Sequence, residues 1–316
     1  MLQHTRDLSP AHDAWSDVGG RLLTALDRII LGKRREHTLA LSCVLAQGHL
    51  LIQDLPGVGK TTLAHALARV LGLSFQRVQF TSDLLPADVI GASIYRRDQQ
   101  QFEFQRGPVF TQLLLADEIN RATPKAQSAL LEAMEEQQVT VDGHTHPLPQ
   151  PFFVVATRNP LEQAGTFPLP ESQLDRFLMQ IELGYPSPAE ERELLTGTDR
   201  RALLATQQPV IDAATLARMQ EAVPSMHVAE PLLDYVQALV AWTRDSGEFA
   251  AGLSPRASIA LLRASQAHAL LMGHAGVHPE DVQAVAPAVV THRLVTREGR
   301  TPGDIGQRLL EAVALP

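Results

Sequence analysis

In the first half of the chain, short apolar runs alternate with longer segments in which the apolar residues have helical spacing. Apolar runs short enough for buried strands open the segments 49–53, 113–122 and 152–160. Residues 61–72 instead carry apolar side chains three and four positions apart and end at Gly72, which predicts a helix. This alternation of strands and helices is typical of an α/β domain with a parallel sheet.

In the last third of the chain the pattern becomes helical. Ser187 and Glu190 have the spacing of a capping box, which predicts the start of a connecting helix. Helical periodicity then covers residues 212–223, 230–245, 254–273 and 278–294. We therefore expect an α/β core over residues 16–186, followed by a linker and a small all-helical lid over residues 187–316. Residues 1–15 lack strong periodicity and are expected to be a flexible N-terminus.

Two segments inside the core have the pattern of inserted strand pairs. Residues 137–148 alternate valine with polar residues around an Asp-Gly turn, the strongest short-range signal of a β-hairpin. Residues 93–107 form a second strand-rich insertion, which interrupts a helix that begins near Leu84. His144 and His146 share one face of the first hairpin. Since no further ligand stands at suitable spacing, we interpret this hairpin as solvated rather than metal-binding.

The segment DLPGVGKTT, residues 54–62, lies between the first apolar run and the first helical run. It ends like the phosphate-binding loop G-x-x-x-x-G-K-[ST], but Asp54 stands where that pattern has its first glycine. A strand, a Gly-rich turn and a helix in this order let backbone N–H groups and a helix N-terminus converge on phosphates. We therefore interpret the segment as a nucleotide-binding loop in which Asp54 changes the entry rather than the phosphate cradle.

Individual residues of this loop have separate predicted roles. Gly57 and Gly59 supply backbone freedom near the phosphates, and Lys60 is placed to reach the β and γ phosphates. Thr61 offers its hydroxyl to Mg²⁺. The candidate nucleotide-binding residues in the loop are Pro56, Gly57, Val58, Gly59, Lys60, Thr61 and Thr62. Only three of the 27 basic residues are lysines, which agrees with a specific need for Lys60.

Two adjacent acids end the second apolar run. Asp117 is placed to hold the Mg²⁺ shell and Glu118 to polarise an attacking water. Two carboxylates at the end of a buried strand are costly to desolvate without such a role. The third apolar run ends in Asn159, which is suited to orienting that water. The predicted catalytic pair is therefore Glu118 and Asn159, with Asp117 and Thr61 as metal ligands.

Composition and charge limit the classes of protein. With 316 residues, 45% hydrophobic content and mean hydropathy of -0.04, the chain is long enough for two domains with their own cores. Its net charge of -8 argues against a general polyanion binder. The one cysteine, Cys43, lies in an apolar run and is expected to be buried and inert. No apolar run approaches the roughly 18 residues of a membrane helix, so we expect a cytoplasmic protein without membrane insertion.

Three long segments of the core carry a resemblance to one family. They read FTSDLLPADVIGA, GPVFTQLLLADEINRATPKAQSALLEAMEEQQVTVDG and ATRNPLEQAGTFPLPESQLDRFLMQIELGYPS. Together they closely resemble the MoxR family of AAA+ ATPases, from about residue 20 to the C-terminus and most densely between 50 and 190. The resemblance implies a P-loop AAA+ core with a parallel sheet and an inserted hairpin, a helical lid, and ATP with Mg²⁺ as cofactors.

The resemblance also implies roles for three residues outside the loop. Arg176, in ESQLDRF, stands where such ATPases carry an arginine that acts on the γ-phosphate bound to a neighbouring subunit. Arg256, in LSPRAS, stands where a lid arginine senses the bound nucleotide. Ser254 as N-cap would put Arg256 in the first turn of its helix, in a lid over the nucleotide crevice. Gly32 resembles the turn on the adenine side.

A function follows from this resemblance as an expectation. It implies a homo-oligomer, as a hexameric ring, that remodels or activates a protein client, often with a partner bearing a von Willebrand factor A domain and sometimes in metal-cofactor insertion. A nucleic-acid motor is the alternative, but the acidic charge and few aromatic residues oppose it. A small-molecule kinase would leave the lid and Arg176 without a role.

Overall fold

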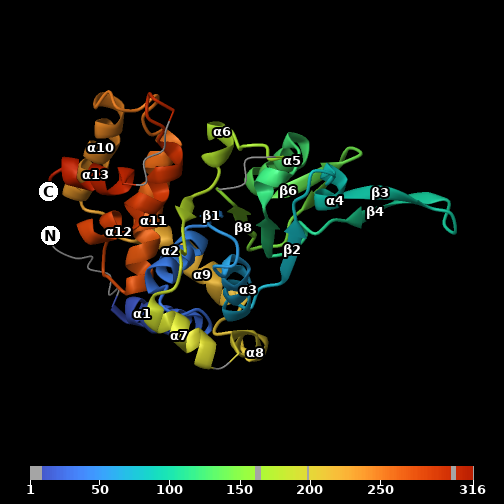
Figure 1. The fold of residues 1–316 in the computed structure, drawn as a ribbon, viewed down its shortest axis with the longest axis horizontal. Coiled ribbons are helices and arrows are strands. Elements are labelled where there is room, and N and C mark those ends of the chain that lie inside the picture. The colour runs from blue at the N-terminus through green and yellow to red at the C-terminus, as the bar shows by residue number, and fades with distance from the viewer. Residues whose placement is uncertain (1–8, 161–164, 198, 300–303, 316) are drawn as a thin grey trace, which may run out of the picture.

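The computed structural model describes residues 9–160, 165–197, 199–299 and 304–315. Its main sheet has five parallel strands in the order β2-β5-β8-β1-β9 (Figure 1). These strands are β1 (Leu50–Gln53), β2 (Phe75–Gln79), β5 (Leu113–Asp117), β8 (Phe153–Arg158) and β9 (Met179–Ile181). The predicted α/β class with a parallel sheet is confirmed.

Helices occupy most of the remaining chain. Up to the last strand they are α1 (Ser9–Ile29), α2 (Arg34–Leu45), α3 (Lys60–Val70), α4 (Pro86–Ile90), α5 (Pro124–Glu136) and α6 (Glu171–Leu174). After it come α7 (Pro188–Thr196), α8 (Arg200–Thr206), α9 (Ala213–Ala222), α10 (Glu230–Asp245), α11 (Pro255–Met272), α12 (Pro279–Val290) and α13 (Ile305–Ala312). Ser187 and Glu190 form the predicted capping box at the start of α7. None of the described helices has the length and apolar character needed to cross a membrane.

The two faces of the sheet belong to two hydrophobic clusters, because side chains alternate along each strand. Leu50 and Ile52 of β1 face a cluster that also contains residues of α1, α2 and α3. Leu51, between them, faces a second cluster built mainly from α5 and its surroundings. The strands β1, β5 and β8 are buried on both sides, as their continuous apolar runs predict.

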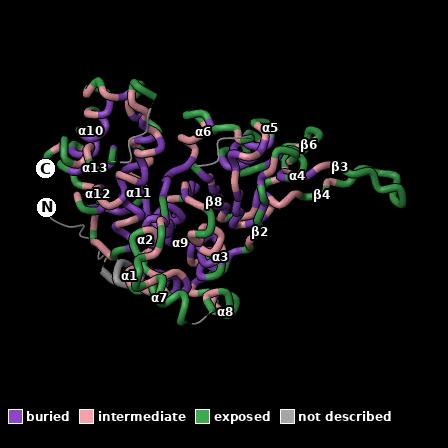
Figure 2. The backbone as a smooth tube through the Cα atoms, viewed as in Figure 1, coloured by how far each residue is buried: buried purple, intermediate pink, exposed green. Residues whose placement is uncertain are grey.

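The helices after the last strand do not form a separate core. The helix α11 packs against α1 and α2, while α12 packs against β9. Residues of α11 and α12, among them Leu261 and Val289, lie in the same hydrophobic cluster as Leu50. The lid is therefore fixed to one side of the sheet through continuous apolar packing. Buried segments run from α11 and α12 into the core (Figure 2).

Both predicted insertions are β-hairpins. Strands β6 (Gln138–Val141) and β7 (His144–Pro147) flank a turn in which Asp142 and Gly143 both have positive φ. Strands β3 (Gly91–Arg96) and β4 (Gln101–Arg106) form a longer hairpin that extends away from the body as exposed chain (Figures 1 and 2). The His146 ring stacks on Phe104 of β4, with centroids 4.1 Å apart. This contact gives His146 a packing role and joins the two hairpins.

The N-terminal segment is more regular than the sequence pattern predicts. The helix α1 begins at Ser9, so part of the segment that we expect to be flexible is helical from Ser9 onward. Residues 1–8 lie outside the described part of the chain. The first helix carries buried Leu22 and Leu26 on a face against the core, and this packing fixes its later turns.

Candidate active site

The loop after β1 has the backbone that phosphate binding requires. Gly57 and Gly59 have φ of +84° and +101°, values that residues with a Cβ rarely adopt. A Cβ at either position would meet no atom within 4 Å, so conformation rather than space requires glycine. Gly59 precedes the first turn of α3, which contains Lys60, Thr61 and Thr62. The first turn of a helix presents backbone N–H groups at its amino end, and this end of α3 follows directly on the loop.

Asp54 has a structural role that explains its departure from the loop pattern. Its carboxylate is buried and accepts the backbone N–H of Leu55 at 2.7 Å. It also accepts the N–H groups of Leu183 and Gly184, at 2.6 and 2.7 Å, from the segment that follows β9. One side chain thus ties the entry of the loop to the neighbouring strand end, which a glycine could not do.

The Lys60 ammonium lies over the entry of the same loop. Its Nζ donates to the carbonyl oxygens of Asp54 and Leu55, at 2.6 and 2.8 Å. These contacts keep the ammonium beside the backbone that would surround the phosphates. A lysine side chain has enough rotatable bonds to turn from these carbonyls to a phosphate oxygen.

Asp117 and Glu118 end β5 at the same edge of the sheet as the loop, because all five strands are parallel. The Asp117 carboxylate accepts a hydrogen bond of 2.6 Å from the Thr157 hydroxyl and pairs with Arg77 at 2.7 Å. Glu118 has a left-handed backbone, with φ +57° and ψ +48°, which is a strained conformation for glutamate. Its Oε2 accepts from Gln79 Nε2 at 2.7 Å.

Sequence reasoning missed Arg77, Gln79 and Thr157. The first two stand at alternate positions of β2, the edge strand, where they face the end of β5. Thr157 is a fully buried polar residue inside the third apolar run, and its hydroxyl also accepts the Glu118 N–H at 2.9 Å. A polar side chain in a buried strand was the available signal for Thr157. The roles of Arg77 and Gln79 depend on strand pairing.

Strand order brings the remaining candidates together. Asn159 follows β8, which lies between β1 and β5, so it is located between the loop and the pair of acids. Gly32, with φ of +68°, lies against the start of α7, where a Cβ would overlap the Glu190 carboxylate. Lys33 Nζ donates to the carbonyl of Tyr185 at 3.0 Å. The Gly32 turn therefore lies beside the chain that leaves β9, close to the contacts made by Asp54.

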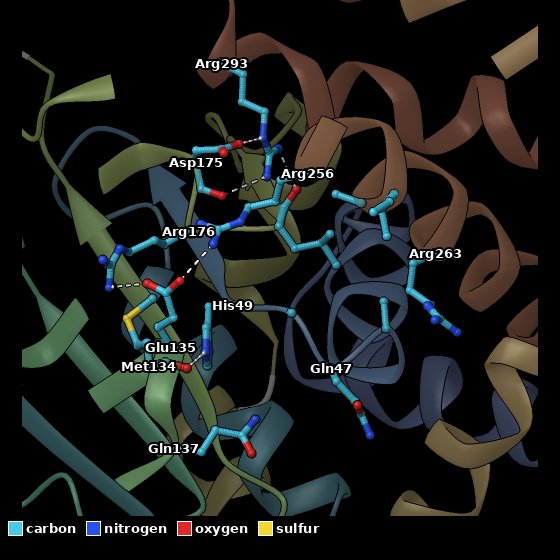
Figure 3. Close-up of a pocket in the computed structure, with 15 residues that line it drawn as sticks. Gln47, His49, Met134, Glu135, Gln137, Asp175, Arg176, Arg256, Arg263 and Arg293 are labelled. Atoms are coloured by element: carbon cyan, nitrogen blue, oxygen red, sulfur yellow. Dashed lines mark hydrogen bonds and ion pairs between the residues drawn. The ribbon is translucent and has the colours of Figure 1, made fainter. Parts of the chain in front are cut away.

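Arg176 and Arg256 lie at the opposite edge of the sheet. Both form ion pairs with Glu135, near the end of α5, with N–O distances of 2.8 Å (Figure 3). Arg176 also donates to the carbonyl of Leu131 at 2.6 Å. The three side chains line a cavity of about 340 Å³ that includes His49, the residue before the amino end of β1. The phosphate-binding loop follows the other end of that strand.

Two further interactions fix this arginine-lined cavity. Arg293, shortly after α12, donates to the Asp175 carboxylate at 2.7 Å and joins the lid to the residue before Arg176 (Figure 3). His49 accepts the Val154 N–H through Nδ1, and its Nε2 lies 3.3 Å from the Met134 carbonyl. Burial lowers the pKa of His49 to about 4, so this imidazole is neutral.

The position of Arg256 corrects the predicted arrangement of the lid. Ser254 caps α11 and Arg256 lies in its first turn, as predicted. However, the lid packs on α1, α2 and β9, and it brings Arg256 to Glu135 rather than over the loop of its own chain. The expectation of a lid over the nucleotide crevice is wrong here, because tertiary packing of the lid, and not its sequence, decides where the arginine lies.

The fold and the site define a P-loop ATPase core of the AAA+ class. A family model described as "ATPase family associated with various cellular activities (AAA)" matches residues 49–179, and a model of the AAA lid domain matches residues 242–312. A solved structure of a putative ATPase from Cytophaga hutchinsonii has 34% identity and a TM-score of 0.86, and the match covers 96% of this chain and 97% of that one.

Relatives over the full length identify the family. The Chaperone MoxR1 of Mycobacterium tuberculosis is 41% identical over 334 residues, which cover 98% of this chain and 88% of that protein. The Protein MoxR of Methylorubrum extorquens is 31% identical, with 96% of both chains covered. The uncharacterized protein YeaC of Bacillus subtilis is 45% identical, with 94% of both covered. The chain belongs to the MoxR family of AAA+ ATPases, and it is an ATPase.

Proposed function

We propose that the chain hydrolyses ATP with Mg²⁺ at the carboxyl edge of its sheet and uses the energy to remodel or activate a partner protein. The observation that carries this proposal is the convergence of the loop, Asp117, Glu118 and Asn159 on one edge of the sheet. Thr61 and Asp117 offer the hydroxyl and carboxylate oxygens that Mg²⁺ prefers, so the residues fit this ion. When bound, Mg²⁺ neutralises charge on the phosphates.

Each side chain of the site has a separate role in the reaction. Lys60 and the N–H groups at the start of α3 bind the phosphates, and Asn159 orients the attacking water. Glu118 accepts the proton of that water. In the structure its Oε2 is bound by Gln79, and Arg121 lies 3.2 Å from the same oxygen. Glu118 is therefore held in place by its neighbours before any substrate is bound.

A shared site between subunits accounts for the two distant arginines. Arg176 and Arg256 lie at the amino edge of the sheet and cannot serve the loop at the carboxyl edge of the same chain in this conformation. In a ring, this edge of one subunit would face the nucleotide of the next. We propose a homo-oligomer, as a hexamer, in which both arginines act on the neighbour's γ-phosphate.

The client is proposed from the relatives. One relative is named a chaperone, which supports a protein as the object of the remodelling. The likeness to the MoxR family supports a partner with a von Willebrand factor A domain and, as one form of the activity, metal-cofactor insertion. We further propose that the hairpins β3–β4 and β6–β7, which contact each other through Phe104 and His146, transmit the nucleotide state to the client.

A nucleic-acid motor is the second candidate function. The Holliday junction branch migration subunit RuvB of an Anaeromyxobacter strain is 30% identical over 187 residues, but these cover only 58% of this chain and 50% of that protein. The net charge of -8 opposes nucleic-acid binding. An ATPase assay with and without DNA separates the two, because a nucleic-acid motor would be stimulated by DNA.

The central test is the substitution Glu118→Gln. Glutamine keeps the size of the side chain but cannot accept the proton, so ATP binding should remain while hydrolysis falls about 10²- to 10⁴-fold. Binding is measured with a fluorescent ATP analogue and hydrolysis by phosphate release. The exposed Glu136→Gln is the matched control and should retain activity. Full turnover in Glu118→Gln would remove Glu118 from its role as general base.

A further inference from the structure

Three histidines surround one buried carboxylate at the turn between α11 and α12. Asp281, in the first turn of α12, has no exposed surface. Its Oδ1 lies 2.7 Å from His268 Nδ1, and both of its oxygens lie 3.0 Å from His274 Nδ1. Its Oδ2 also accepts the backbone N–H of His278 at 2.8 Å. The turn thus gathers four polar side chains that have no part in the nucleotide site.

The charge of Asp281 is compensated differently from that of other largely buried acids. Asp117 pairs with Arg77 and Asp175 with Arg293, each at 2.7 Å. In the described chain the ion pairs of Asp281 involve histidines only. Histidine is mostly neutral at neutral pH. A cation beside this buried carboxylate would be an imidazolium or a bound metal ion.

Hydrogen bonds fix the orientation of the Asp281 carboxylate. Its oxygens are bound by His268, by His274 and by the backbone N–H of His278. His268 binds the carboxylate at Oδ1 and is not one of the three grouped ligand residues. Such an outer hydrogen bond orients a ligating carboxylate in many metal sites.

The ligand atoms of His274, His278 and Asp281 all lie within 4.8 Å of one another. A tetrahedral ion with bonds of about 2.0–2.2 Å needs its ligand atoms about 3.4 Å apart. The His274 and His278 rings are stacked with centroids 4.8 Å apart, so one ring must rotate to close the site. His278 is exposed, so its ring is the one that can turn toward solvent.

We propose that His274, His278 and Asp281 form a binding site for a divalent transition-metal ion of the zinc type. Two imidazoles and one carboxylate are a donor set that suits Zn²⁺, Co²⁺ or Ni²⁺ better than Mg²⁺, which prefers oxygen. The exposed position of His278 leaves a coordination position open to water. The site is separate from the nucleotide site in both residues and ligand chemistry.

Metal binding here would link two helices of the lid, α11 and α12. His274 follows the end of α11, while His278 and Asp281 lie at the start of α12. One ion would join the two helices at their connecting turn. The same helix α11 carries Arg256 at its other end, so the ion would stiffen the element that holds this arginine.

Titration of the full-length, tag-free chain with Zn²⁺ tests the proposal. The protein is first stripped with a chelator and kept free of nucleotide, and binding is followed by calorimetry and by melting temperature. We expect one equivalent of Zn²⁺ and a rise in melting temperature, since an ion that binds only the folded state stabilises it. Co²⁺ should bind with the visible absorption of a site with nitrogen ligands.

Substitutions at exposed positions provide the comparison. His278→Gln should weaken Zn²⁺ binding at least ten-fold and abolish the rise in melting temperature, while the metal-free variant melts like the parent. The control is His144→Gln, which replaces an exposed histidine of the β6–β7 hairpin. It should change neither the Zn²⁺ affinity nor the rise in melting temperature. The proposal is overturned if the folded parent binds no Zn²⁺, or if His278→Gln binds it as tightly as the parent does. Asp281→Asn is avoided because it removes a buried hydrogen-bond acceptor.

Discussion

At the scale of single residues, Asp54 connects the carboxyl ends of two neighbouring strands, β1 and β9. Its carboxylate receives three backbone N–H groups, one from the loop and two from the segment after β9. A residue that satisfies three backbone donors is hard to replace, because each buried donor left without an acceptor costs about 1–3 kcal/mol. Asp54 therefore departs from the usual loop pattern and, through the same carboxylate, stabilises the two strand ends.

We predict that Asp54→Ala lowers the free energy of unfolding by about 3 kcal/mol, since the three N–H groups lose their acceptor. Asp54→Asn keeps one side-chain oxygen and should lose less. Unfolding in urea, followed by circular dichroism, measures both. Equal stability of Asp54→Ala and the parent would show that water replaces the carboxylate at no cost.

At the scale of helices and strands, Glu135 joins three parts of the chain. It lies near the end of α5 and pairs with Arg176 after α6 and with Arg256 at the start of α11. The side chains involved are between 30% and 56% exposed, so each pair contributes only about 0.2–1 kcal/mol. Pairs of this strength can hold both arginines in the isolated chain and still release them to a phosphate.

We predict that Glu135→Gln raises the steady-state ATPase rate about two- to five-fold. The arginines would no longer be shared with a competing carboxylate, and about 1 kcal/mol corresponds to about five-fold. Rates are measured at several protein concentrations, so that assembly is included. Glu136→Gln, one residue further on an exposed position, is the control. A lower rate in Glu135→Gln would instead show that Glu135 positions the arginines for catalysis.

At the scale of the whole molecule, the two functional edges of the sheet lie on opposite sides of the core. The loop and the acids follow the carboxyl ends of the strands, while the arginine-lined cavity lies at their amino ends. A single chain therefore offers half of a site at each edge. Our proposal of a ring depends on this separation, because a closed cyclic assembly brings the two different edges together.

Mixing two inactive variants tests this arrangement. Arg176→Ala should bind ATP normally but hydrolyse it about 10³-fold more slowly, as expected when an arginine finger is lost. Glu118→Gln is inactive for a different reason. Mixtures should regain part of the activity, because a parental pair of Glu118 and Arg176 forms at some interfaces. Phosphate release is measured on mixtures whose co-assembly is verified by a tagged subunit.

Two results would contradict the shared site. An active monomer of the parent chain would show that the carboxyl edge suffices for hydrolysis. Co-assembled mixtures without any recovered activity would show that Glu118 and Arg176 do not act across one interface. Melting temperatures of both variants serve as the control, since Arg176 also contacts the Leu131 carbonyl and its loss could weaken α5.

The sequence by itself determined the features that depend on neighbours along the chain. The loop of Gly57 and Gly59, the Asp-Gly turn at 142–143, the capping box of Ser187 and the cap at Ser254 are all observed where predicted. Each depends on backbone conformation or on hydrogen bonds within a few residues, so the order of residues suffices to specify it. The buried strands were equally clear, because burial on both faces requires continuous apolar runs.

Only the tertiary structure decided which distant residues meet. Arg77 and Asp117 are 40 residues apart, and Arg256 and Glu135 are 121 apart, so no local pattern relates them. The position of the lid follows from the packing of α11 against α1 and α2. This packing depends on the shape of the apolar surfaces and not on their periodicity along the chain. For this reason the sequence predicted that Arg256 begins a helix, whereas the fold decided that it lies beside Arg176, at the edge of the sheet opposite to its own nucleotide loop.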